Sequence, residues 1–430
     1  MDSISKGFAV FFILIIAFSS LTIILATIPL GMAQSGTNTS TIISSDTAWT
    51  QVNSPYNIKG NLLVNSGTSL TLATGTTLNL NGYMVVTGSL IIQQGVTINI
   101  QNASGYIQVD GTLQALGTNS SPISINGAGQ VYSIGAFYGG ISYSAITFSQ
   151  QSIGWNQQTS SGSIIENTII NSTTLTTSNS IKLSQDTFAN DFNIKGGSPL
   201  ITGCTIKSGF TIWDGSPIIS NNQIKGGITL EGDYGFSSGQ VTYINDNSIS
   251  GQVLCLEAPF RSAVVFERNF VTNSNGSAID IAFSTNIGCS MIIINNTITN
   301  SAVGIQLHYG YPQLISNNNI YGNTVNFKLD NDHSINCTFN WWGTIDQQAI
   351  GKSIYDFNYD FTLGTVNFVP FLTAPNQEAM PNPDASITTL NPSATPTPTV
   401  PEVSWLTILP LLLLMFFVAV VARYRKVKHG

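Results

Sequence analysis

The chain has 430 residues and a formal net charge of −7, and only 8% of its residues are charged, against about a quarter in an average soluble domain. With an isoelectric point near 4.8 and no basic stripe to meet phosphates, the composition argues against a nucleic-acid-binding protein. The polar surface must come from Asn, Ser, Thr, Gln and Gly, which is typical of β-rich surface or secreted proteins and not of cytoplasmic helical enzymes.

The N-terminal segment predicts an export signal. Lys6 precedes an apolar run over residues 8–32, and the small residue Ala33 follows it. This order is typical of a secretory signal, so we predict that residues 1–33 are a signal peptide cleaved after Ala33. The run is long for such a segment, which leaves an uncleaved membrane anchor as the alternative.

Residues 41–372 carry an internal repeat. The phrase "GSPLITGCTIKSG" at 197–209 recurs as "GSPIISNNQIKGG" at 215–227, and related phrases return at spacings of 18 to 28 residues. Alternating apolar and variable positions follow each copy, as in "FTIW" from Phe210 and "ITLE" from Ile228. This alternation predicts half-buried strands. A unit so short buries its apolar side chains only by stacking on its neighbours, which predicts an all-β solenoid of roughly eleven or twelve coils.

One turn position of the repeat predicts a ladder of buried side chains. It lies two residues before an apolar Ile or Phe, and Asn is its commonest occupant. Because stacked coils are about 4.8 Å apart, an amide there can hydrogen-bond to the amides above and below it. A thiol fits the same slot as a small hydrophobe, whereas Arg268 breaks the column. The predicted ladder consists of Asn167, Asp186, Cys204, Asn222, Asn247, Asn296, Asn318 and Cys337.

The repeats "GSPIISNNQI" and "INNTITNSAVGIQL" resemble those of the right-handed parallel β-helix, or pectin-lyase-like, superfamily. The resemblance covers about residues 55–345 and implies a right-handed solenoid. Residues 339–376 are similar to the tail that closes membrane-anchored surface β-helix proteins of archaea and bacteria, where it would cover the open edge of the last coil. The family's lyases use a basic residue beside Ca²⁺-binding acids and its glycosidases use clustered Asp residues, and neither set maps onto this chain.

The outward positions of the repeated strands predict a ligand-binding face. Laid in register, they collect the densest charge of a charge-poor chain, with an aromatic residue beside carboxylates as a platform for sugars. The same register places Cys255 on this outer face. The alternative is that these side chains are simply solvated. The predicted ligand-binding residues are Trp213, Glu231, Glu257, Asp280, His308 and Asp330.

Glu231 and Glu257 are predicted neighbours about 4.8 Å apart on adjacent coils. Two carboxylates at that distance suit a shared Ca²⁺, the only cofactor that the sequence suggests. They also suit a retaining glycosidase, whose two carboxyl groups are about 5 to 5.5 Å apart. Candidates for a catalytic role are therefore Glu231, Glu257 and His308, although we predict no catalysis.

The four cysteines are predicted to remain free thiols, because the register places Cys204 and Cys337 six coils apart, about 29 Å by strand spacing, and a disulfide needs Cα atoms within about 7 Å. Sequons in turn-like sequence predict glycosylation at Asn102, Asn119 and Asn275.

The C-terminal segment predicts a membrane tether. Residues 373–402, with "NPSATPTPTVPE", predict an extended Pro, Thr and Ser-rich stalk. Residues 403–422 are uncharged and long enough to span a bilayer as a helix. The basic residues in 423–430 would stay in the cytoplasm, which places the solenoid outside the cell. The "PEV" at 401–403 loosely resembles archaeal sorting tails.

Together these features predict a single-pass, membrane-anchored extracellular β-helix protein without catalysis. It would bind glycans, or act as an adhesion or envelope component. The alternative is a tethered polysaccharide lyase or glycoside hydrolase.

Overall fold

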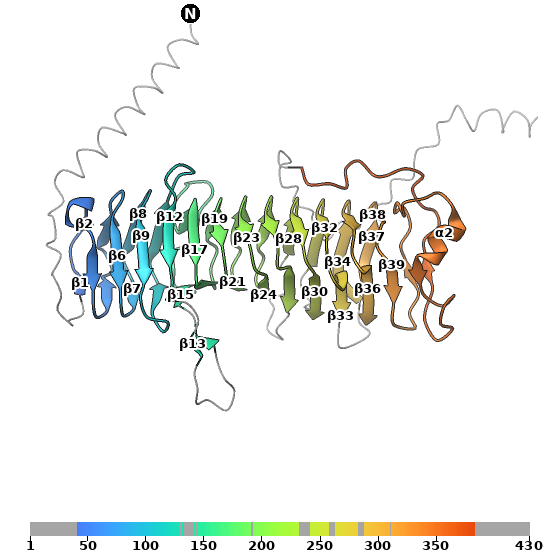
Figure 1. Cartoon of the computed structure of the whole chain (residues 1–430), viewed down its shortest axis with the longest axis horizontal. Coiled ribbons are helices and arrows are strands. Elements are labelled where there is room, and N and C mark those ends of the chain that lie inside the picture. Colours follow the sequence, from blue (N-terminus) through green and yellow to red (C-terminus); the bar gives the residue numbers. More distant parts are fainter. Residues whose placement is uncertain are drawn as a thin grey trace, which may run out of the picture. The chain divides into compact units, whose positions relative to one another are not determined.

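The structure is a computed structural model that describes residues 41–128, 131–132, 141–142, 144–190, 192–231, 241–257, 263–282, 288–309 and 311–382. These residues form a right-handed parallel β-solenoid of about 11 turns with almost no helix (Figure 1). The predicted signal peptide 1–33, the stalk from residue 383 and the span 403–422 lie outside the described residues. Within the described ranges, no helix is both long and apolar enough to cross a membrane.

Three parallel sheets run along the solenoid, and successive coils contribute one short strand to each sheet in the order A, B, C, until sheet A alone continues for two more strands at the C-terminal end. Sheet A consists of β1 (Thr41–Ile43), β4 (Leu62–Val64), β7 (Met84–Val86), β10 (Tyr106–Val109), β15 (Ser144–Phe148), β18 (Thr173–Thr177), β21 (Phe192–Lys195), β24 (Phe210–Asp214), β27 (Ile228–Glu231), β30 (Val253–Glu257), β33 (Ser277–Ala282), β36 (Val303–Tyr309), β39 (Val325–Leu329) and β41 (Ile354–Tyr355).

Sheet B consists of β2 (Thr47–Trp49), β5 (Ser69–Leu72), β8 (Ser89–Gln93), β11 (Thr112–Leu116), β16 (Ile164–Glu166), β19 (Lys182–Ser184), β22 (Leu200–Thr202), β25 (Ile218–Ser220), β28 (Val241–Asn245), β31 (Ala263–Glu267), β34 (Gly288–Ile294) and β37 (Tyr311–Ser316). Sheet C consists of β3 (Tyr56–Ile58), β6 (Thr77–Leu80), β9 (Thr97–Ile100), β12 (Ile123–Asn126), β17 (Thr168–Asn171), β20 (Thr187–Phe188), β23 (Thr205–Ile206), β26 (Gln223–Ile224), β29 (Ser248–Ser250), β32 (Phe270–Thr272), β35 (Thr297–Thr299) and β38 (Asn319–Ile320).

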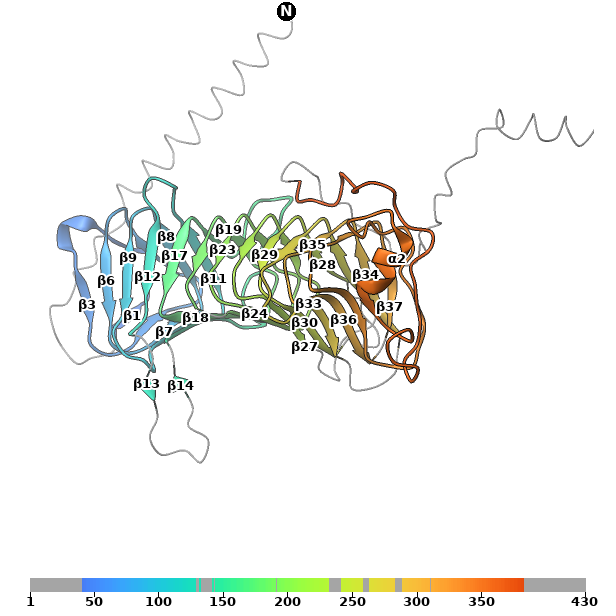
Figure 2. The same ribbon diagram turned by 45° about the vertical axis from the view of Figure 1, so that its right-hand side comes forward.

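Two further strand pairs and two helical segments complete the described elements. The antiparallel pair β13 (Val131–Tyr132) and β14 (Ile141–Ser142) projects from the stack of coils (Figure 2). The parallel pair β40 (Ile335–Asn336) and β42 (Val366–Asn367) lies at the C-terminal end, near helix α2 (Gln347–Lys352), while the 3-10 helix η1 (Gln51–Asn53) lies at the N-terminal end.

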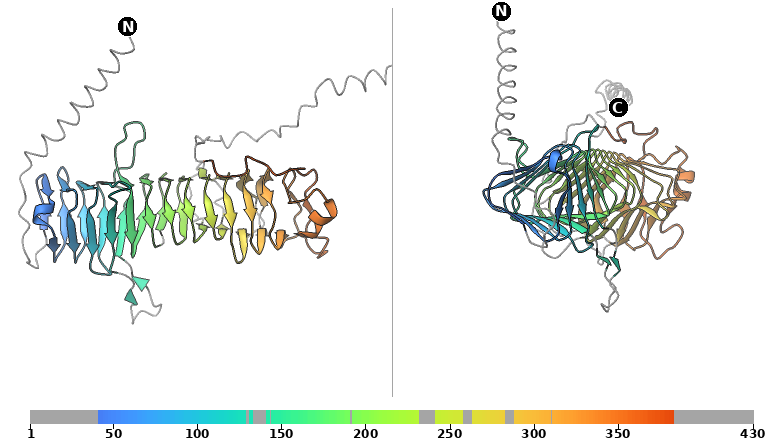
Figure 3. Two further views of the ribbon diagram at one scale, coloured as in Figure 1. Left: turned by 45° about the horizontal axis from the view of Figure 1, so that its top comes forward. Right: turned by 60° about the vertical axis from the view of Figure 1, so that its left-hand side comes forward.

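The core is a column of inward side chains that stack from coil to coil. It lies inside the stack of coils that Figure 3 shows from two further sides. Phe192 stacks on Phe210 with ring centroids 4.6 Å apart, and Phe188 lies 5.2 Å from Phe192. Because strand side chains alternate between the two faces, each apolar position of the repeat falls in register with its copies on adjacent coils. The repeat therefore produces one continuous apolar interior, as the alternation predicted.

A ladder of buried amides runs along the turn between sheets B and C. The side-chain Nδ2 of each member donates to the Oδ1 of the next at 3.0 to 3.1 Å, and the backbone N–H of each member donates to the same Oδ1. Each of these oxygens thus satisfies two buried donors, except that of the first member, Asn222, which accepts the N–H of Cys204. The members are Asn222, Asn247, Asn269, Asn296, Asn318 and Asn340.

The ladder differs from the predicted column at three coils. Arg268 does not interrupt it, because Asn269 occupies the slot and Val271, not Phe270, points into the core. Arg268 instead has a left-handed backbone, with φ of 50°, and occupies the turn position before the ladder. The pattern was aligned one residue too early here, because Phe270 imitates the inward apolar residue.

The same one-residue shift explains the coil of Asn167, whereas at the C-terminal end the ladder slot lies three residues after Cys337. Asn167 has φ of 49° and Thr168 fills the ladder slot behind it, paired in register with the strand start at Ile123. At the C-terminal end Asn340 takes the slot, and Cys337 is buried elsewhere, with its N–H donating to the carbonyl of Asn367.

Asp186 and Cys204 do stand in the column, at its N-terminal end. Asp186 accepts hydrogen bonds from the N–H groups of Thr168 (2.8 Å) and Ser184 (3.0 Å), and its burial raises the pKa of its carboxyl group well above the usual value. Cys204 is a buried free thiol, and its N–H donates to Asn222 Oδ1 at 2.8 Å. Cys255 and Cys337 also form no disulfide, whereas the side chain of Cys289 lies outside the described residues.

The C-terminal residues cover the end of the stack and then turn back along it. β41 continues sheet A, and the buried Trp342 packs edge-on against Phe368 with ring centroids 6.4 Å apart. This cap is in the place that the sequence predicted. Residues 373–382, which the sequence assigned to the stalk, belong to a segment at 372–382 that contacts the turns between sheets B and C. We call residues 372–382 the strap.

Candidate functional site

The outward face of sheet A carries the predicted ligand-binding residues. One row of this face follows the strand register from coil to coil, because residues paired across parallel strands point to the same side. Toward the C-terminal end the row changes from small polar residues to charged and aromatic ones. Its members are Asn193, Thr211, Thr229, Leu254, Asp280, Gln306, Lys328 and Tyr355.

A compact cluster forms where three adjacent strands of this face end. His308 lies between two carboxylates, with its Nε2 3.4 Å from Asp280 Oδ1 and its Nδ1 3.3 Å from Asp330 Oδ2. Lys328 Nζ lies 3.1 Å from the same Oδ2 of Asp330. The structure therefore brings together three of the six predicted residues, and we call Asp280, His308, Lys328 and Asp330 the acid–histidine cluster.

Amide side chains hold the two carboxylates in place. Gln252 Nε2 donates to Asp280 Oδ2 at 3.0 Å, and Gln306 Nε2 donates to Asp330 Oδ2 at 2.6 Å. Gln306 is in turn fixed by the hydroxyl of Ser277, which donates to its Oε1. The cluster is thus preorganised by hydrogen bonds from neighbouring coils.

Asp280 is the electrostatically unusual member of the cluster. Its burial, reinforced by the nearby charge of Asp330, raises the pKa of its carboxyl group, while His308, Gln252 and Lys328 act in the opposite direction. Its Oδ1 is buried and makes no hydrogen bond within the described residues, with the imidazole at 3.4 Å as its ion-pair contact. A carboxyl group in this state can donate a proton or accept a hydrogen bond from a ligand.

Trp213 and Glu231 lie farther along the same face. Trp213 is 37% exposed, and its Nε1 lies 3.5 Å from Asn193 Oδ1. It belongs to β24, three strands from β33, which is about 14 Å at the usual strand spacing. Glu231 pairs in register with Glu257, as predicted, but across a bulge. The side chain of Glu257 lies outside the described residues.

Cys255 is not on the outer face. Thr229 pairs with Leu254, so Cys255 points inward and is buried, while Leu254 takes the outward position. The repeat "LCLE" was read one residue out of register, because the bulge between Leu230 and Glu231 inserts a residue that strict alternation does not contain. A similar irregularity pairs Ala282 with Tyr309, not with His308.

Sequence reasoning did not identify Gln252, Ser277, Gln306 or Lys328 as partners of the acids. Gln306 and Lys328 both bind Asp330, which follows β39, although Gln306 belongs to β36. The alternation of the repeat indicates that these residues share a face. Which residues become hydrogen-bond partners depends on how far each side chain reaches across and along the strands.

Two further predictions concern metal binding and glycosylation. Within the part of the chain that the structure describes, no group of three or more His, Cys, Asp or Glu residues is arranged to hold a metal ion. Ca²⁺ binding at Glu231 and Glu257 stays a prediction, as does glycosylation at Asn102, Asn119 and Asn275, all of which are exposed.

Comparison with known proteins finds a family model that matches part of the solenoid. A family model described as "Right handed beta helix region" matches residues 226–350. The matched region contains the acid–histidine cluster and most of the amide ladder. No curated protein and no solved structure was found to match the chain.

Proposed function

We propose that this protein is an extracellular, membrane-anchored β-helix that binds glycans through the outward face of sheet A, without catalysis. The observation that carries the proposal is the acid–histidine cluster, a set of charged side chains preorganised on a continuous face of a chain that is otherwise poor in charge. Support for the anchor comes from the sequence of residues 1–33 and 403–430. An adhesion or envelope role is the cellular form that such binding would take.

The face offers both kinds of polar group that sugars need. The carboxylates of Asp280 and Asp330 accept hydrogen bonds from hydroxyl groups, whereas Lys328 and His308 donate. Trp213 offers an exposed ring for stacking. A glycan lying along the solenoid axis would span β24 to β39, five strand steps or about 24 Å. Contacts this open and few predict weak binding, with a Kd in the millimolar to micromolar range.

Charge on the face favours neutral glycans over polyuronates. Glu231, Asp280 and Asp330 are acidic, and the basic groups beside Asp280 and Asp330 are Lys328 and His308. A polyuronate would bring further carboxylates close to these groups, and like charges at short range disfavour each other. Binding of a polyuronate would therefore need Ca²⁺ between the carboxylates.

A glycan array with the purified chain, with and without Ca²⁺, tests the proposal. Asp330→Asn and Trp213→Ala should each weaken binding of a long neutral glycan at least several-fold, while thermal unfolding stays nearly unchanged. Lys225→Ala is the matched control, because Lys225 is an exposed charge in the turn that follows β26, outside the outward face of sheet A. Equal binding by all four proteins, or by none of them, contradicts the proposal.

A second candidate function is acid–base cleavage of a polysaccharide, and the raised pKa of Asp280 favours it. Asp280 would serve as the general acid and Asp330 as the general base, the usual division of labour between two carboxyl groups in different surroundings. In that case Asp280→Asn should abolish turnover of a polysaccharide but retain its binding. Binding by the parent protein without release of reducing ends or unsaturated products would leave only the binding function.

A further inference from the structure

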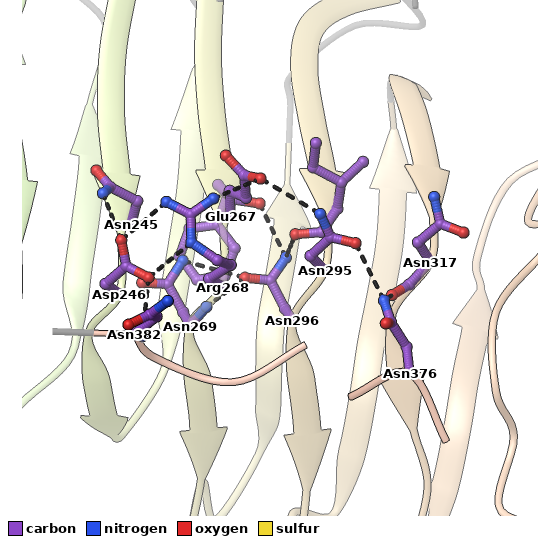
Figure 4. A network of polar contacts seen from close by, with 12 residues as sticks. Asn245, Asp246, Glu267, Arg268, Asn269, Asn295, Asn296, Asn317, Asn376 and Asn382 are labelled. Atoms are coloured by element: carbon purple, nitrogen blue, oxygen red, sulfur yellow. Dashed lines mark hydrogen bonds and ion pairs between the residues drawn. The ribbon is translucent and has the colours of Figure 1, made fainter. Parts of the chain in front are cut away.

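The strap lies along the corner between sheets B and C, and it runs against the direction of the coils. Its contacts begin at the β38 coil, continue at the β35 coil and end beside the β28–β29 turn. Figure 4 shows Asn376 and Asn382 of the strap beside this corner. This corner faces away from sheet A, because each coil visits the three sheets in turn.

The first contact binds both the N–H and the carbonyl group of one strap residue. Asn319 Oδ1 accepts from the N–H of Asn376 at 2.8 Å, and Asn319 Nδ2 donates to the carbonyl of Asn376 at 2.9 Å. The side chain of Asn376 also donates to Asn295 Oδ1 at 3.0 Å. Such a paired amide contact recognises an extended peptide through its backbone.

The second contact buries a small side chain. Ala379 is 0% exposed, and its carbonyl accepts a hydrogen bond from the hydroxyl of Thr297 at 2.5 Å. Glu378, next to it, is exposed and interacts with the rest of the strap only through its N–H, which donates to Asn376 Oδ1. The corner therefore distinguishes between adjacent positions of the strap.

The third contact uses a preformed ion-pair group. The N–H of Asn382 donates to Asp246 Oδ1 at 3.1 Å. Arg268 holds that carboxylate with Nε at 2.7 Å and Nη2 at 2.9 Å, and its Nη1 lies 2.7 Å from Glu267 Oε1. The Asp246 side chain is 0% exposed. The strap therefore binds to a carboxylate whose position is already fixed by Arg268.

The turn geometry explains why these side chains face the strap. The residue before each ladder Asn has a left-handed backbone, with φ between 50° and 59° at Asp246, Arg268, Asn295 and Asn317. Where the ladder residue turns inward, this preceding residue is left on the surface of the corner. Three of the four, Asp246, Asn295 and Asn317, provide groups that contact the strap directly.

We propose that this corner is a peptide-binding groove whose occupant is the chain's own strap, and that the strap fixes where the rest of the chain leaves the solenoid. The exit point is then Asn382 at the β28–β29 turn, and not the C-terminal cap. If the proposed membrane tether is correct, on which this consequence rests, attachment at this corner leaves the glycan-binding face of sheet A free.

Limited proteolysis of the full chain with a broad-specificity protease, followed by intact mass measurement, tests the proposal. The parent protein should yield a solenoid fragment that ends at or after Asn382. Ala379→Gln has no room in the docked strap, so its fragment should end at or before Glu378, with unchanged thermal unfolding of the solenoid. Glu378→Ala, which alters only an exposed side chain, should behave as the parent.

Asn376→Ala provides a second variant that changes the strap alone, and it should also shorten the fragment. The proposal is overturned if the parent is trimmed back to residue 372, or if both strap variants leave the parent fragment. None of these readouts involves glycan binding, so failure of the groove and failure of the proposed function are distinguishable.

Discussion

The N-terminal and C-terminal halves of the solenoid build the same turn between sheets B and C in two ways. In the N-terminal half the left-handed position is Gly75 or Gly95, with φ of 71° and 70°, and the buried residue that follows is Thr76 or Val96. In the C-terminal half the left-handed position is usually Asn or Asp, and the buried residue is a ladder Asn. In the first design Val96 needs no polar partner and the hydroxyl of Thr76 donates to the backbone carbonyl of Trp49, whereas the second connects neighbouring coils through hydrogen bonds between side chains.

The N-terminal half also has an amide ladder, but on the outside of sheet C. Nδ2 to Oδ1 hydrogen bonds of 2.8 to 3.2 Å join successive side chains there, which are partly or fully exposed. The members are Asn57, Asn79, Asn99, Asn126 and Asn171. The comparison teaches that burial, and not hydrogen-bond geometry, decides what an amide ladder contributes, because water replaces a lost partner only at the surface.

Breaking the buried ladder should have the largest effect. Asn269→Leu leaves the backbone N–H of Asn247 without its acceptor and the carbonyl of Ile244 without the Asn269 amide that donates to it, and it removes one of the three acceptors of Asn247 Nδ2. Each buried group without a partner costs about 1 to 3 kcal/mol, so the free energy of unfolding should fall by about 3 kcal/mol. Chemical denaturation measures this, and a neutral result would show that the ladder contributes little to stability.

Replacing the glycine of the N-terminal turn should have an intermediate effect. Gly95→Ala forces a residue with a Cβ into a left-handed conformation, which costs about 1 to 2 kcal/mol, and places that Cβ 2.6 Å from the Ser121 hydroxyl. Asn221→Gly, at the same turn position with φ of 58°, is the matched control and should change stability far less. Equal losses for both variants would mean that the two turn designs do not differ in backbone strain.

Asp186→Asn tests the boundary between the two halves, because Asp186 lies where the buried ladder begins. We expect the variant to be more stable than the parent at neutral pH. Burial raises the pKa of Asp186 above the usual 3.8, so its contribution to stability is full below that value and is lost as the pH rises through the folded-state pKa. Asn bears no such charge. The melting temperature of the variant should therefore exceed that of the parent increasingly as the pH is raised from 3 to 7.

A variant that is less stable than the parent at pH 7, or a difference that does not change with pH, would contradict this. The control is Asp360→Asn. The Asp360 carboxylate accepts an exposed hydrogen bond from the hydroxyl of Thr362, and this bond lowers the pKa of Asp360 instead of raising it. Its melting-temperature difference should not grow in favour of the variant with rising pH.

Breaking the exposed ladder should have the smallest effect. Asn99→Leu removes hydrogen bonds to Asn79 and Asn126 at the surface of sheet C. Water solvates the freed groups, so the loss should be about 0.5 kcal/mol. Measured beside Asn269→Leu under the same conditions, a loss of equal size would refute the distinction drawn between the two ladders.

The sequence alone determined the solenoid, the direction in which side chains point on most strands, and the existence of an amide ladder. These follow from local alternation and from a repeat that buries its apolar residues only by stacking. It also placed Asp280, His308 and Asp330 on one face, because side chains paired in register share a side of the sheet.

The tertiary structure decided everything that depends on one extra residue or on a distant segment. Asn269 replaced Arg268 in the ladder, and Cys255 turned inward, because left-handed turns and bulges shift the register without changing the look of the pattern. Lys328 and the two glutamines joined the acids through side-chain reach across strands. The strap docked at Asp246 through a contact between residues 136 positions apart, and no local periodicity encodes a pairing at that separation.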